Sequence, residues 1–422
     1  MLVIADATLA DGRRVDVRVD RARGTIDAVG EGLTGDEQLD AAGRLLLPGM
    51  VDAHVHFREP GFPHKETWTT GSRSAAAGGV TTVVDQPNTD PPTVTGAAFD
   101  EKAALAHASL VDWGVNGGVT PDWDPDGLLD RPLFALGEVF LADSTGDMGI
   151  DAGLFEDAVA RAAEAGVPVT VHAEAAERFD ESARGRDDVD AWSDYRTPEA
   201  EVVAVERAGA VAARQGVPLH VAHVSTPEGV DAAAAAGMTC EVTPHHLLLS
   251  RDDLDDLGTL GKMNPPLRDE ARRAALFDRV VDGTVDLVAT DHAPHTLAEK
   301  DASVWDAPSG VPGVETALPL LLEVARRGGL TYERVRDLTA ATPAAVFDLP
   351  RKGRVEAGRD ADLVLVEPDA SRAIRGEDLH SKCGWTPFEG RRGVFPEWTM
   401  VRGRFVWREG AFGTAAGENV RG

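Results

Sequence analysis

The chain has little cysteine, little lysine and no long apolar run, and each shortage excludes a class of protein. Only Cys240 and Cys383 occur among its 422 residues, which excludes a disulfide framework or a zinc-ribbon site and fits a reducing compartment. No apolar stretch approaches the length of a membrane span, and the first residues lack the basic start and apolar stretch of a signal peptide. We therefore expect a soluble, globular protein of the cytoplasm.

Basic residues are scarce as well. The chain has 71 acidic and 42 basic residues, of which only six are lysines, and its net charge of −29 is spread along the whole sequence. This charge argues against nucleic acid or an anionic membrane as a partner. A dispersed acidic excess with little lysine is typical of proteins that work in concentrated salt, where charge repulsion is screened. A GC-rich genome and ordinary solubility would explain the same composition.

Short β-branched runs alternate with alanine-rich stretches through the central part of the chain. This alternation is the pattern of parallel strands joined by crossover helices, and eight such strands predict an α/β fold of the (β/α)8 barrel type. The expected strands are residues 50–56, 79–86, 111–119, 133–141, 167–174, 217–224, 238–246 and 285–293.

Helices are expected over 151–166 and 199–216, because each of these stretches ends in a glycine immediately before the next strand. Apolar and polar residues alternate at both ends of the chain, in residues 1–47 and again near 351–369 and 397–410. We therefore predict a small composite β domain of residues 1–48 and 350–422, and a barrel of residues 49–349.

Histidines and an aspartate gather where the expected barrel strands end. Catalytic groups of such barrels come from the carboxyl ends of the strands. A lone buried histidine is more often a core residue, but several at the same end of different strands indicate a site for zinc or a similar divalent metal ion. The candidates are His54, His56, His172, His220, His223 and Asp291. His245 and His246 end the seventh expected strand, and since adjacent strand residues face opposite sides, at most one should enter the barrel mouth.

Several longer motifs carry a family resemblance. The run DAHVHFREPG (52–61), followed by HKE (64–66), is similar to the first-strand signature of dihydroorotases in the amidohydrolase superfamily. Further matches follow in family order along nearly the whole chain. They are PNTDPP (87–92), VHAE (171–174), HVST (223–226), KMNPPLR (262–268), ATDHAPH (289–295), VPGVETALPLLL (311–322) and, towards the end, KGRVEAGRDADLVLV and SKCGWTPFEG.

The resemblance implies a metal-dependent (β/α)8 barrel and the reversible hydrolysis of (S)-dihydroorotate to N-carbamoyl-L-aspartate in de novo pyrimidine biosynthesis. By motif, the implied metal ligands are His54, His56, His172, His223 and Asp291, which hold one or two Zn²⁺ ions, two being favoured; His220 is read as structural. The metal lowers the pKa of a bound water toward ~7, which provides hydroxide at neutral pH. Asp291 then takes a proton and delivers it to the leaving amide nitrogen.

The substrate carries a carboxylate, which a guanidinium can bind through two parallel hydrogen bonds. Arg58, which lies two residues beyond His56 and is expected on the same side of the strand, is placed for this role, although a surface ion pair is the alternative. The resemblance adds Asn88 and His295 to the carboxylate site and Asn264 to the loop over the ring. Allantoinases and hydantoinases, which are the alternative functions, act on cyclic amides without this carboxylate. Allantoinases typically show NEPG where this chain has FREPG, and hydantoinases lack the REPG run, so the motif favours dihydroorotase.

The chain departs from the family at the fourth expected strand. Many of these enzymes bridge two metals with a carboxylated lysine there, but no lysine occurs between Lys102 and Lys262, and Glu138 takes the aligned position. We expect the Glu138 carboxylate to bridge two metals. The alternatives are Asp143 or Asp147 as the bridge, an enzyme with one metal, or a Glu138 that is merely paired with an arginine.

The missing lysine also leaves open a non-catalytic homologue that acts as a scaffold. For the enzyme, the resemblance implies a homodimer and an association with aspartate transcarbamoylase. Gln86, where the family commonly has methionine, has no assigned role.

Overall fold

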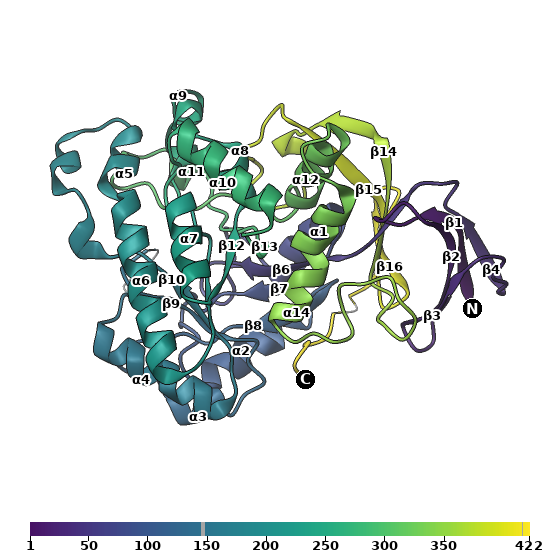
Figure 1. Cartoon of the computed structure of the whole chain (residues 1–422), viewed down its shortest axis with the longest axis horizontal. Coiled ribbons are helices and arrows are strands. Elements are labelled where there is room, and N and C mark those ends of the chain that lie inside the picture. Colours follow the sequence, from purple (N-terminus) through teal and green to yellow (C-terminus); the bar gives the residue numbers. More distant parts are fainter. Residues whose placement is uncertain (145–147, 416) are drawn as a thin grey trace.

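A barrel and a separate sheet make up the computed structural model, which describes residues 1–144, 148–415 and 417–422. Figure 1 shows strands enclosed by helices on one side and, on the other, a sheet in which purple N-terminal and yellow-green C-terminal strands lie together. The chain therefore begins and ends in the same sheet.

The separate sheet has nine strands in the order β17-β16-β15-β14-β5-β1-β2-β3, with β4 paired to β1. The two ends of the chain meet where β14 runs antiparallel to β5, with Leu363 opposite Pro48. Its strands are β1 Leu2–Thr8, β2 Arg14–Asp20, β3 Thr25–Gly30, β4 Glu37–Asp40, β5 Leu45–Pro48, β14 Leu363–Ala373, β15 Arg392–Val401, β16 Arg404–Arg408 and β17 Ala411–Phe412.

Apolar side chains from both ends of the chain share one core in this sheet, including Ile4, Val17, Leu365 and Trp398. The expected β texture near 351–369 becomes a strand only at Leu363, because turns and irregular backbone occupy the residues before it. We keep the division into residues 1–48 plus 350–422 and 49–349 as a proposal.

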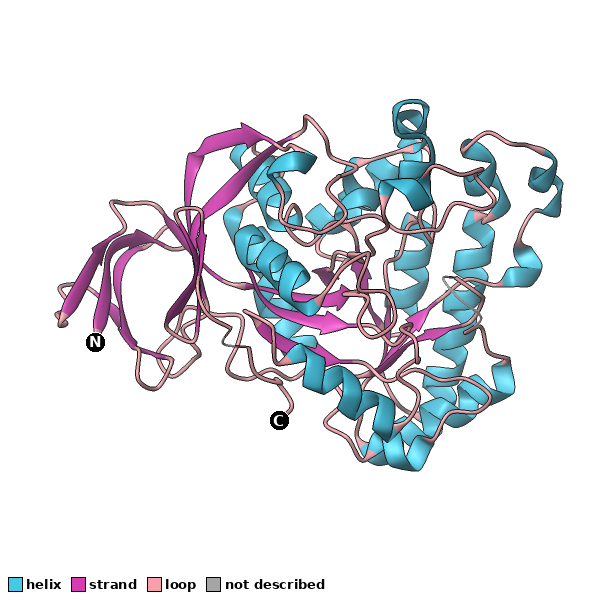
Figure 2. Ribbon diagram, turned by 180° about the vertical axis from the view of Figure 1, so that it is seen from behind, coloured by secondary structure: helices cyan, strands magenta, loops and turns pink. Residues whose placement is uncertain are grey.

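The eight barrel strands form two parallel arcs, β6-β7-β8 and β9-β10-β11-β12-β13. Isolated parallel bridges join the arcs on both sides, Gly117 to Leu136 and Val55 to His292, so the strands follow one another around a ring. Figure 2 shows these strands in magenta with helices around them. The strands are β6 Met50–Val55, β7 Val80–Asp85, β8 Asp112–Val115, β9 Leu136–Phe140, β10 Val169–His172, β11 Leu219–Val221, β12 Thr239–Val242 and β13 Leu287–Val288. The predicted (β/α)8 architecture is confirmed.

The helices follow the barrel strands in the expected alternation. The two predicted helices are present as α4 and α6, and each ends at a left-handed glycine, Gly166 or Gly216. Of the helices that the structure describes, none combines the length and the apolar character needed to cross a bilayer. The α-helices are α1 Trp68–Gly78, α2 Gly96–Ala106, α3 Pro125–Leu129, α4 Ala152–Ala165, α5 Asp190–Tyr195, α6 Pro198–Gln215, α7 Pro227–Ala235, α8 Pro244–Leu248, α9 Leu254–Leu257, α10 Glu270–Asp282, α11 Leu297–Lys300, α12 Ala317–Arg326, α13 Tyr332–Arg336 and α14 Thr342–Val346.

Most expected strands extend beyond the observed ones, as for residues 285–293 against β13, and one is also wrong in type at its end. Residues 238–246 were expected to be extended, but β12 stops at Val242 and α8 starts at Pro244, with the Thr243 hydroxyl capping the helix. Proline fits the first turn of a helix because its missing N–H needs no partner there. His245 and His246 are therefore helical, and the strand alternation does not apply to them.

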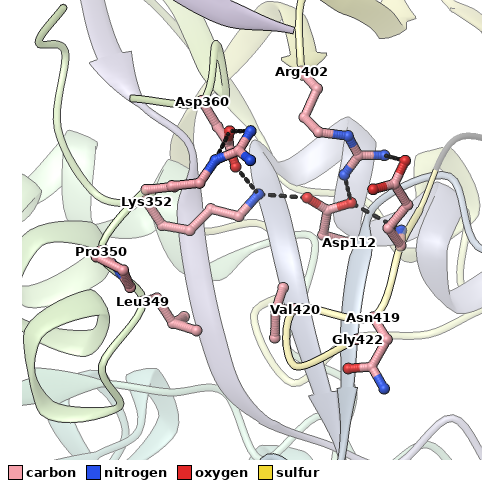
Figure 3. A pocket seen from close by; sticks show the side chains of 11 residues that line it. Asp112, Leu349, Pro350, Lys352, Asp360, Arg402, Asn419, Val420 and Gly422 are labelled. Atoms are coloured by element: carbon pink, nitrogen blue, oxygen red, sulfur yellow. Dashed lines mark hydrogen bonds and ion pairs between the residues drawn. The ribbon is translucent and has the colours of Figure 1, made fainter. Parts of the chain in front are cut away.

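A buried charge cluster joins the barrel to the sheet. Lys352 Nζ lies 2.5 Å from an Asp362 oxygen and 3.1 Å from an Asp360 oxygen, and it also pairs with Asp112 of β8. Arg402, in the turn between β15 and β16, pairs with the other oxygen of Asp112 (Figure 3). All three carboxylates are buried, and the positive charges of Lys352, Arg402 and Arg351, which pairs with Asp360, offset the cost of their burial.

Candidate metal centre and active site

The predicted metal ligands come together at the carboxyl ends of the barrel strands. His54 and Glu138 lie within β6 and β9, His172 is the last residue of β10, and His223 and Asp291 follow β11 and β13 by two and three residues. All five are at least nine-tenths buried. Their convergence follows from the parallel arrangement, which brings the ends of all strands to one rim.

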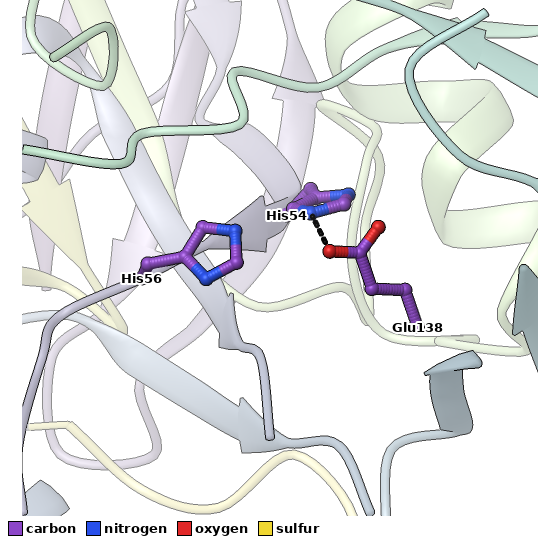
Figure 4. A group of neighbouring side chains, drawn as sticks. All are labelled: His54, His56 and Glu138. Atoms are coloured by element: carbon purple, nitrogen blue, oxygen red, sulfur yellow. Dashed lines mark ion pairs between the residues drawn. The ribbon is translucent and has the colours of Figure 1, made fainter. Parts of the chain in front are cut away.

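Two overlapping groups of possible ligands share one carboxylate. His54, His56 and Glu138 form one trio whose candidate ligand atoms lie within 4.8 Å of one another, and Glu138, His172 and His223 form the second. Figure 4 shows His54 and His56 facing Glu138. Glu138 Oε1 lies 3.6 Å from His54 Nε2, and Glu138 Oε2 lies 2.7 Å from His223 Nε2. Glu138 thus belongs to both trios.

The donor set fits a divalent cation. Among the described residues, the buried ring nitrogens His54 Nε2 and His223 Nδ1 have no hydrogen-bond partner, and Asp291 Oδ1 lies 2.9 Å from His56 Nε2 and 3.7 Å from His54 Nε2. Burial opposes ionisation of Glu138 and Asp291, but the surrounding histidines hold the pKa of both carboxyls well below the usual range. Anionic carboxylates beside imidazoles are the ligands that zinc-like ions prefer.

Three of the histidines are held from behind by an oxygen acceptor. His54 Nδ1 lies 2.7 Å from Glu241 Oε1, and His172 Nε2 lies 2.7 Å from Glu174 Oε2. His56 Nδ1 lies 2.7 Å from Asn88 Oδ1. Such a contact fixes the tautomer and the orientation of the ring, so that the other nitrogen faces the trios. For His172, burial works against the charged form, but the hydrogen bonds of Glu138 and Glu174 raise its pKa to about 9.

Glu241 and Glu174 were missed as functional residues by the sequence reasoning. Glu174 lies in the VHAE motif, and Glu241 lies in the seventh expected strand. A glutamate near the end of a buried strand is the sequence signal that could have identified both residues. His220, predicted to be structural, lies with its Nε2 3.1 Å from Glu241 and its Nδ1 2.9 Å from the Thr239 hydroxyl. It supports the glutamate that holds His54.

Gln86 acquires a role from its contacts. Its Oε1 accepts from the backbone N–H of Glu138 at 2.9 Å and from Asn116 Nδ2 at 3.0 Å, and its Nε2 donates to the Ala53 carbonyl. The neighbouring Lys102 is fully buried and donates to the Gln86 carbonyl and to Asp85. Gln86 thereby ties the strand that carries Glu138 to the first arc.

Arg58 is a buried guanidinium next to the ligands. It is 3% exposed, and it forms no ion pair with any carboxylate of the described residues. Burial lowers its pKa to about 10, so it remains charged at neutral pH. It does not continue the strand as expected, because its φ of 65° lies in the left-handed region, as do those of His223 (36°) and Asp291 (45°). Such backbone strain in non-glycine residues is characteristic of functional sites.

His295 lies directly behind Arg58. Its Nδ1 is 3.1 Å from Lys65 Nζ and its Nε2 is 2.9 Å from the Ser309 carbonyl, so Nδ1 accepts and Nε2 donates. Arg58 Nη2 lies 3.1 Å from the same Nε2. Because Nε2 carries a hydrogen, it cannot accept a hydrogen bond from Arg58, and the Nη2 hydrogens remain available to another acceptor. Arg58 Nε donates to the Pro294 carbonyl.

A pocket opens over these groups. Asn264 Nδ2 donates to Ser144 Oγ at 3.0 Å, and Asn264 Oδ1 accepts from Trp192 of α5 at 3.0 Å. Ser144 was not foreseen from the sequence. The lining residues are His56, Arg58, Asn88, Glu138, Ser144, His223, Asn264, Asp291, Ala293, Ser309 and Gly310.

Two buried lysines fasten the loops around the pocket. Lys300 Nζ donates to the carbonyls of Lys262 and Pro308, each at 2.9 Å, and Lys262 Nζ donates to the Ala307 carbonyl. Burial lowers the pKa of Lys262 to about 8. These contacts join the loop that carries Asn264 to the loop that follows His295.

Of the remaining candidates that the structure describes, none belongs to either of these two trios. Asp143 is exposed, and its Oδ1 accepts from the Gly149 N–H, while Asp147 lies outside the described residues. His246 bonds the Thr243 hydroxyl and the Pro265 carbonyl. A third acidic trio, Asp112 with Asp360 and Asp362, is paired with three cations, Lys352, Arg402 and Arg351.

Comparison with known proteins agrees with this arrangement. The amidohydrolase family matches residues 142–404, and a family described as dihydro-orotase-like matches residues 43–229. The dihydroorotase of Halobacterium salinarum is 70% identical over 423 residues, which is 100% of both chains. The chain belongs to the dihydroorotases of the amidohydrolase family.

Two further known proteins are similar to this chain over most of its length. The dihydroorotase of Methanosarcina mazei is 45% identical over 394 residues, covering 89% of this chain and 86% of that one. Among solved structures, the L-hydantoinase (dihydropyrimidinase) of Arthrobacter aurescens has a TM-score of 0.94 at 28% identity and covers 99% of both chains. The high identity to a protein from a halophile agrees with the salt-adapted composition.

Proposed function

We propose that this dihydroorotase family member catalyses the reversible hydrolysis of (S)-dihydroorotate to N-carbamoyl-L-aspartate in de novo pyrimidine biosynthesis. The observation that carries the proposal is the buried guanidinium of Arg58, which lines the same pocket as the shared carboxylate Glu138 and has no ion-pair partner among the described residues. A buried charge of this kind requires a partner, and the carboxylate of the substrate supplies it.

The metal would be held by six residues, and we favour two Zn²⁺ ions because Glu138 belongs to both trios. His54, His56 and Asp291 would hold one ion and His172 and His223 the other, with Glu138 between them. When bound, a divalent ion supplies Lewis acidity, which polarises the ring amide carbonyl and lowers the pKa of water. Metal content per chain tests this count.

Arg58 fixes the position of the ring. Its guanidinium binds the substrate carboxylate, and His295 behind it stays neutral, because burial and the charges of Arg58 and Lys65 keep its pKa well below the usual value. Asn264 lies over the pocket where the ring would sit, held by Ser144 and Trp192. Asn88 acts through His56, whose Nδ1 it holds, and also lines the carboxylate site.

Asp291 transfers the proton. Its lowered pKa keeps the carboxylate ionised at neutral pH, and its side chain lines the pocket. In hydrolysis, water adds to the ring carbonyl carbon, Asp291 holds the proton that water loses, and the ring C–N bond breaks as that proton passes to the nitrogen. Ring closure runs through the same steps in reverse.

The similarity to a hydantoinase structure supports a second candidate, a cyclic amidohydrolase for rings without a carboxylate. Such a substrate would leave the Arg58 charge buried and unpaired, so we rank this candidate below dihydroorotase. A non-catalytic scaffold ranks lower still, since all the proposed ligand and substrate residues are present.

Assembly and location remain proposals. We propose a homodimer that associates with aspartate transcarbamoylase, and a cytoplasmic enzyme, as the two free buried cysteines suggest. Sedimentation of the purified chain, alone and mixed with aspartate transcarbamoylase, tests the assembly.

Activity is tested with the metal-loaded enzyme in concentrated KCl. We expect turnover of dihydroorotate, and much weaker turnover of dihydrouracil, which has the same ring without the carboxylate. Efficient hydrolysis of dihydrouracil or allantoin with none of dihydroorotate would establish the second candidate instead. No turnover of any of these compounds would favour the scaffold.

A further inference from the structure

One buried arginine contacts both the support of a metal ligand and the loops over the pocket. Arg196 comes directly after α5 and is 3% exposed. Its backbone is held on both sides, because its N–H donates to the Trp192 carbonyl at 3.1 Å and its own carbonyl accepts from Arg268 Nη1 at 2.5 Å. The guanidinium therefore extends from a fixed point of the chain.

The Arg196 guanidinium binds the carboxylate that holds His172. Arg196 Nη2 donates to Glu174 Oε2 at 2.6 Å, and Arg196 Nε lies 3.0 Å and 3.1 Å from the two oxygens of the same carboxylate. Glu174 Oε2 also lies 2.7 Å from His172 Nε2. Because Arg196 and His172 share this oxygen, the guanidinium fixes the acceptor that sets the direction of the imidazole ring.

The same guanidinium reaches the loop that follows β9. Arg196 Nη1 and Nη2 each donate to the Asp143 carbonyl at 3.2 Å. The next residue, Ser144, lines the pocket and accepts from Asn264 Nδ2. Arg196 thus holds the backbone beside one wall of the pocket.

Two aromatic rings lie against this guanidinium. Arg196 Cζ is 4.8 Å from the centre of the Phe179 ring and 5.6 Å from the centre of the Trp192 ring. Trp192 Nε1 in turn donates to Asn264 Oδ1 at 3.0 Å. Since a guanidinium is attracted to the face of an aromatic ring, Arg196 also supports the indole that holds Asn264.

We propose that Arg196 is a positioning residue that links the orientation of His172 to the placement of Ser144 and Asn264. The inference rests on the proposed function, in which His172 holds a metal ion and Asn264 lies over the substrate ring. A guanidinium suits this role because its donors lie in one plane and its faces remain available to aromatic rings. A lysine at this position has one charged nitrogen and no such plane.

Arg196→Met and Arg196→Lys separate the two sides of this link. Methionine leaves the buried Glu174 without its cation, so metal affinity should fall by about tenfold, the lower end for the loss of support behind a ligand histidine. Lysine keeps a charge for Glu174 and should restore metal affinity to near the wild-type value. It cannot also bind the Asp143 carbonyl and stack on Trp192, so KM for dihydroorotate should stay raised by about tenfold, with kcat little changed.

Two measurements follow these effects. Metal retained after dialysis against a weak chelator reports on the His172 side, and kcat and KM at saturating metal report on the pocket side. R178Q is the matched control, because it removes an exposed arginine of the same segment that pairs with Glu199. This variant should keep both the metal and the KM of the wild type.

The double substitution E174Q/R196M tests the route to the metal. If Arg196 acts through Glu174, the double variant should retain as much metal as E174Q alone, because changes at two residues in contact are not additive. It also removes both charges of the buried pair, so it avoids the unpaired carboxylate that destabilises R196M. Losses that multiply in the double variant would overturn this route.

Two other results would overturn the proposal. One is wild-type metal retention and KM in both R196M and R196K, and the other is an R196K that loses metal as readily as R196M. Failure of the proposed function is a separate result, which is seen in the wild type alone as bound metal without turnover of dihydroorotate. Metal retention by the variants still tests Arg196 in that case.

Discussion

Glu241 Oε1 lies 2.7 Å from His54 Nδ1, and the other oxygen of the same carboxylate lies 3.1 Å from His220 Nε2. Burial works against a charged carboxylate, but the two histidines lower the pKa of Glu241 to about 2, so it is ionised at neutral pH. One anion thus orients two rings and leaves His54 Nε2 directed towards Glu138.

Glu241→Gln keeps the size of the side chain but removes its charge. We expect metal affinity to fall by about 10–100-fold, as is typical when an acceptor behind a ligand histidine is lost. Elemental analysis after dialysis against a weak chelator measures this directly. Glu164→Gln, an exposed change on α4, is the matched control, and equal metal retention by both variants would show that Glu241 only packs.

Glu138→Ala should reduce the metal content from two per chain to one. Because metal-ion catalysis supplies several kcal/mol, we expect kcat/KM for dihydroorotate to fall by at least about 1000-fold. Asp143→Ala, an exposed carboxylate in the following loop, should keep both metals and the activity. One metal in wild type and Glu138→Ala alike, with activity retained, would mean a mononuclear enzyme.

Arg58→Lys tests the carboxylate site while keeping the positive charge. A lysine cannot form the paired hydrogen bonds of a guanidinium, so KM for dihydroorotate should rise by about tenfold or more, which corresponds to the loss of one charge-assisted bond. The weak hydrolysis of dihydrouracil, which has no carboxylate, should change little. A loss that is equal for both substrates would instead indicate a general disturbance of the pocket.

Lys352→Met should destabilise the junction of barrel and sheet by about 3–5 kcal/mol, the usual result of leaving buried charges unpaired. In the wild type, burial alone would raise the pKa of Asp112, but Lys352 and Arg402 lower it below the usual value. The stabilising contribution of Asp112 to the folded state is therefore present above about pH 4 and is lost as the pH falls. In Lys352→Met, the carboxyls of the cluster lose the ammonium beside them, and their pKa values rise. As the pH rises and they ionise, the free energy of unfolding of the variant therefore falls.

The difference in unfolding free energy between wild type and Lys352→Met should therefore be larger at about pH 8 than at about pH 5. Denaturant titration at both pH values measures it. An equal difference at the two values would mean that the lysine acts through packing alone.

The sequence was sufficient to predict the barrel and to place the candidate ligands near one another. His54 and Asp291 are distant in sequence, but parallel strands bring all their carboxyl ends to one rim, and a pattern of strands therefore implies where the side chains meet. Glu138 could be proposed because it stands where relatives have lysine. Its metal-bridging role remains a prediction, and the metal analysis above tests it.

Other features could not be predicted because they depend on contacts between distant segments. Gln86 supports Glu138 only because the arcs bring residue 86 beside β9, and Glu241 holds His54 from the opposite arc. Arg58 was expected to continue the strand alternation, but its left-handed backbone turns it towards Pro294 and His295. His245 and His246 were misjudged because a proline that starts a helix was taken as part of a strand.

Five of the six lysines have their ammonium groups bonded inside the protein, four of them at buried residues and Lys65 at a half-buried one. Lys382 is the exposed one. Reagents that acylate amines need a nitrogen that is accessible and free of its proton. Among the described residues, the folded chain therefore offers them mainly Lys382, whose Nζ donates to the Pro63 carbonyl at the surface, and the N-terminus. Attachment of dyes or surfaces through amines would be concentrated at these two points, whereas unfolding would expose all six lysine side chains to modification.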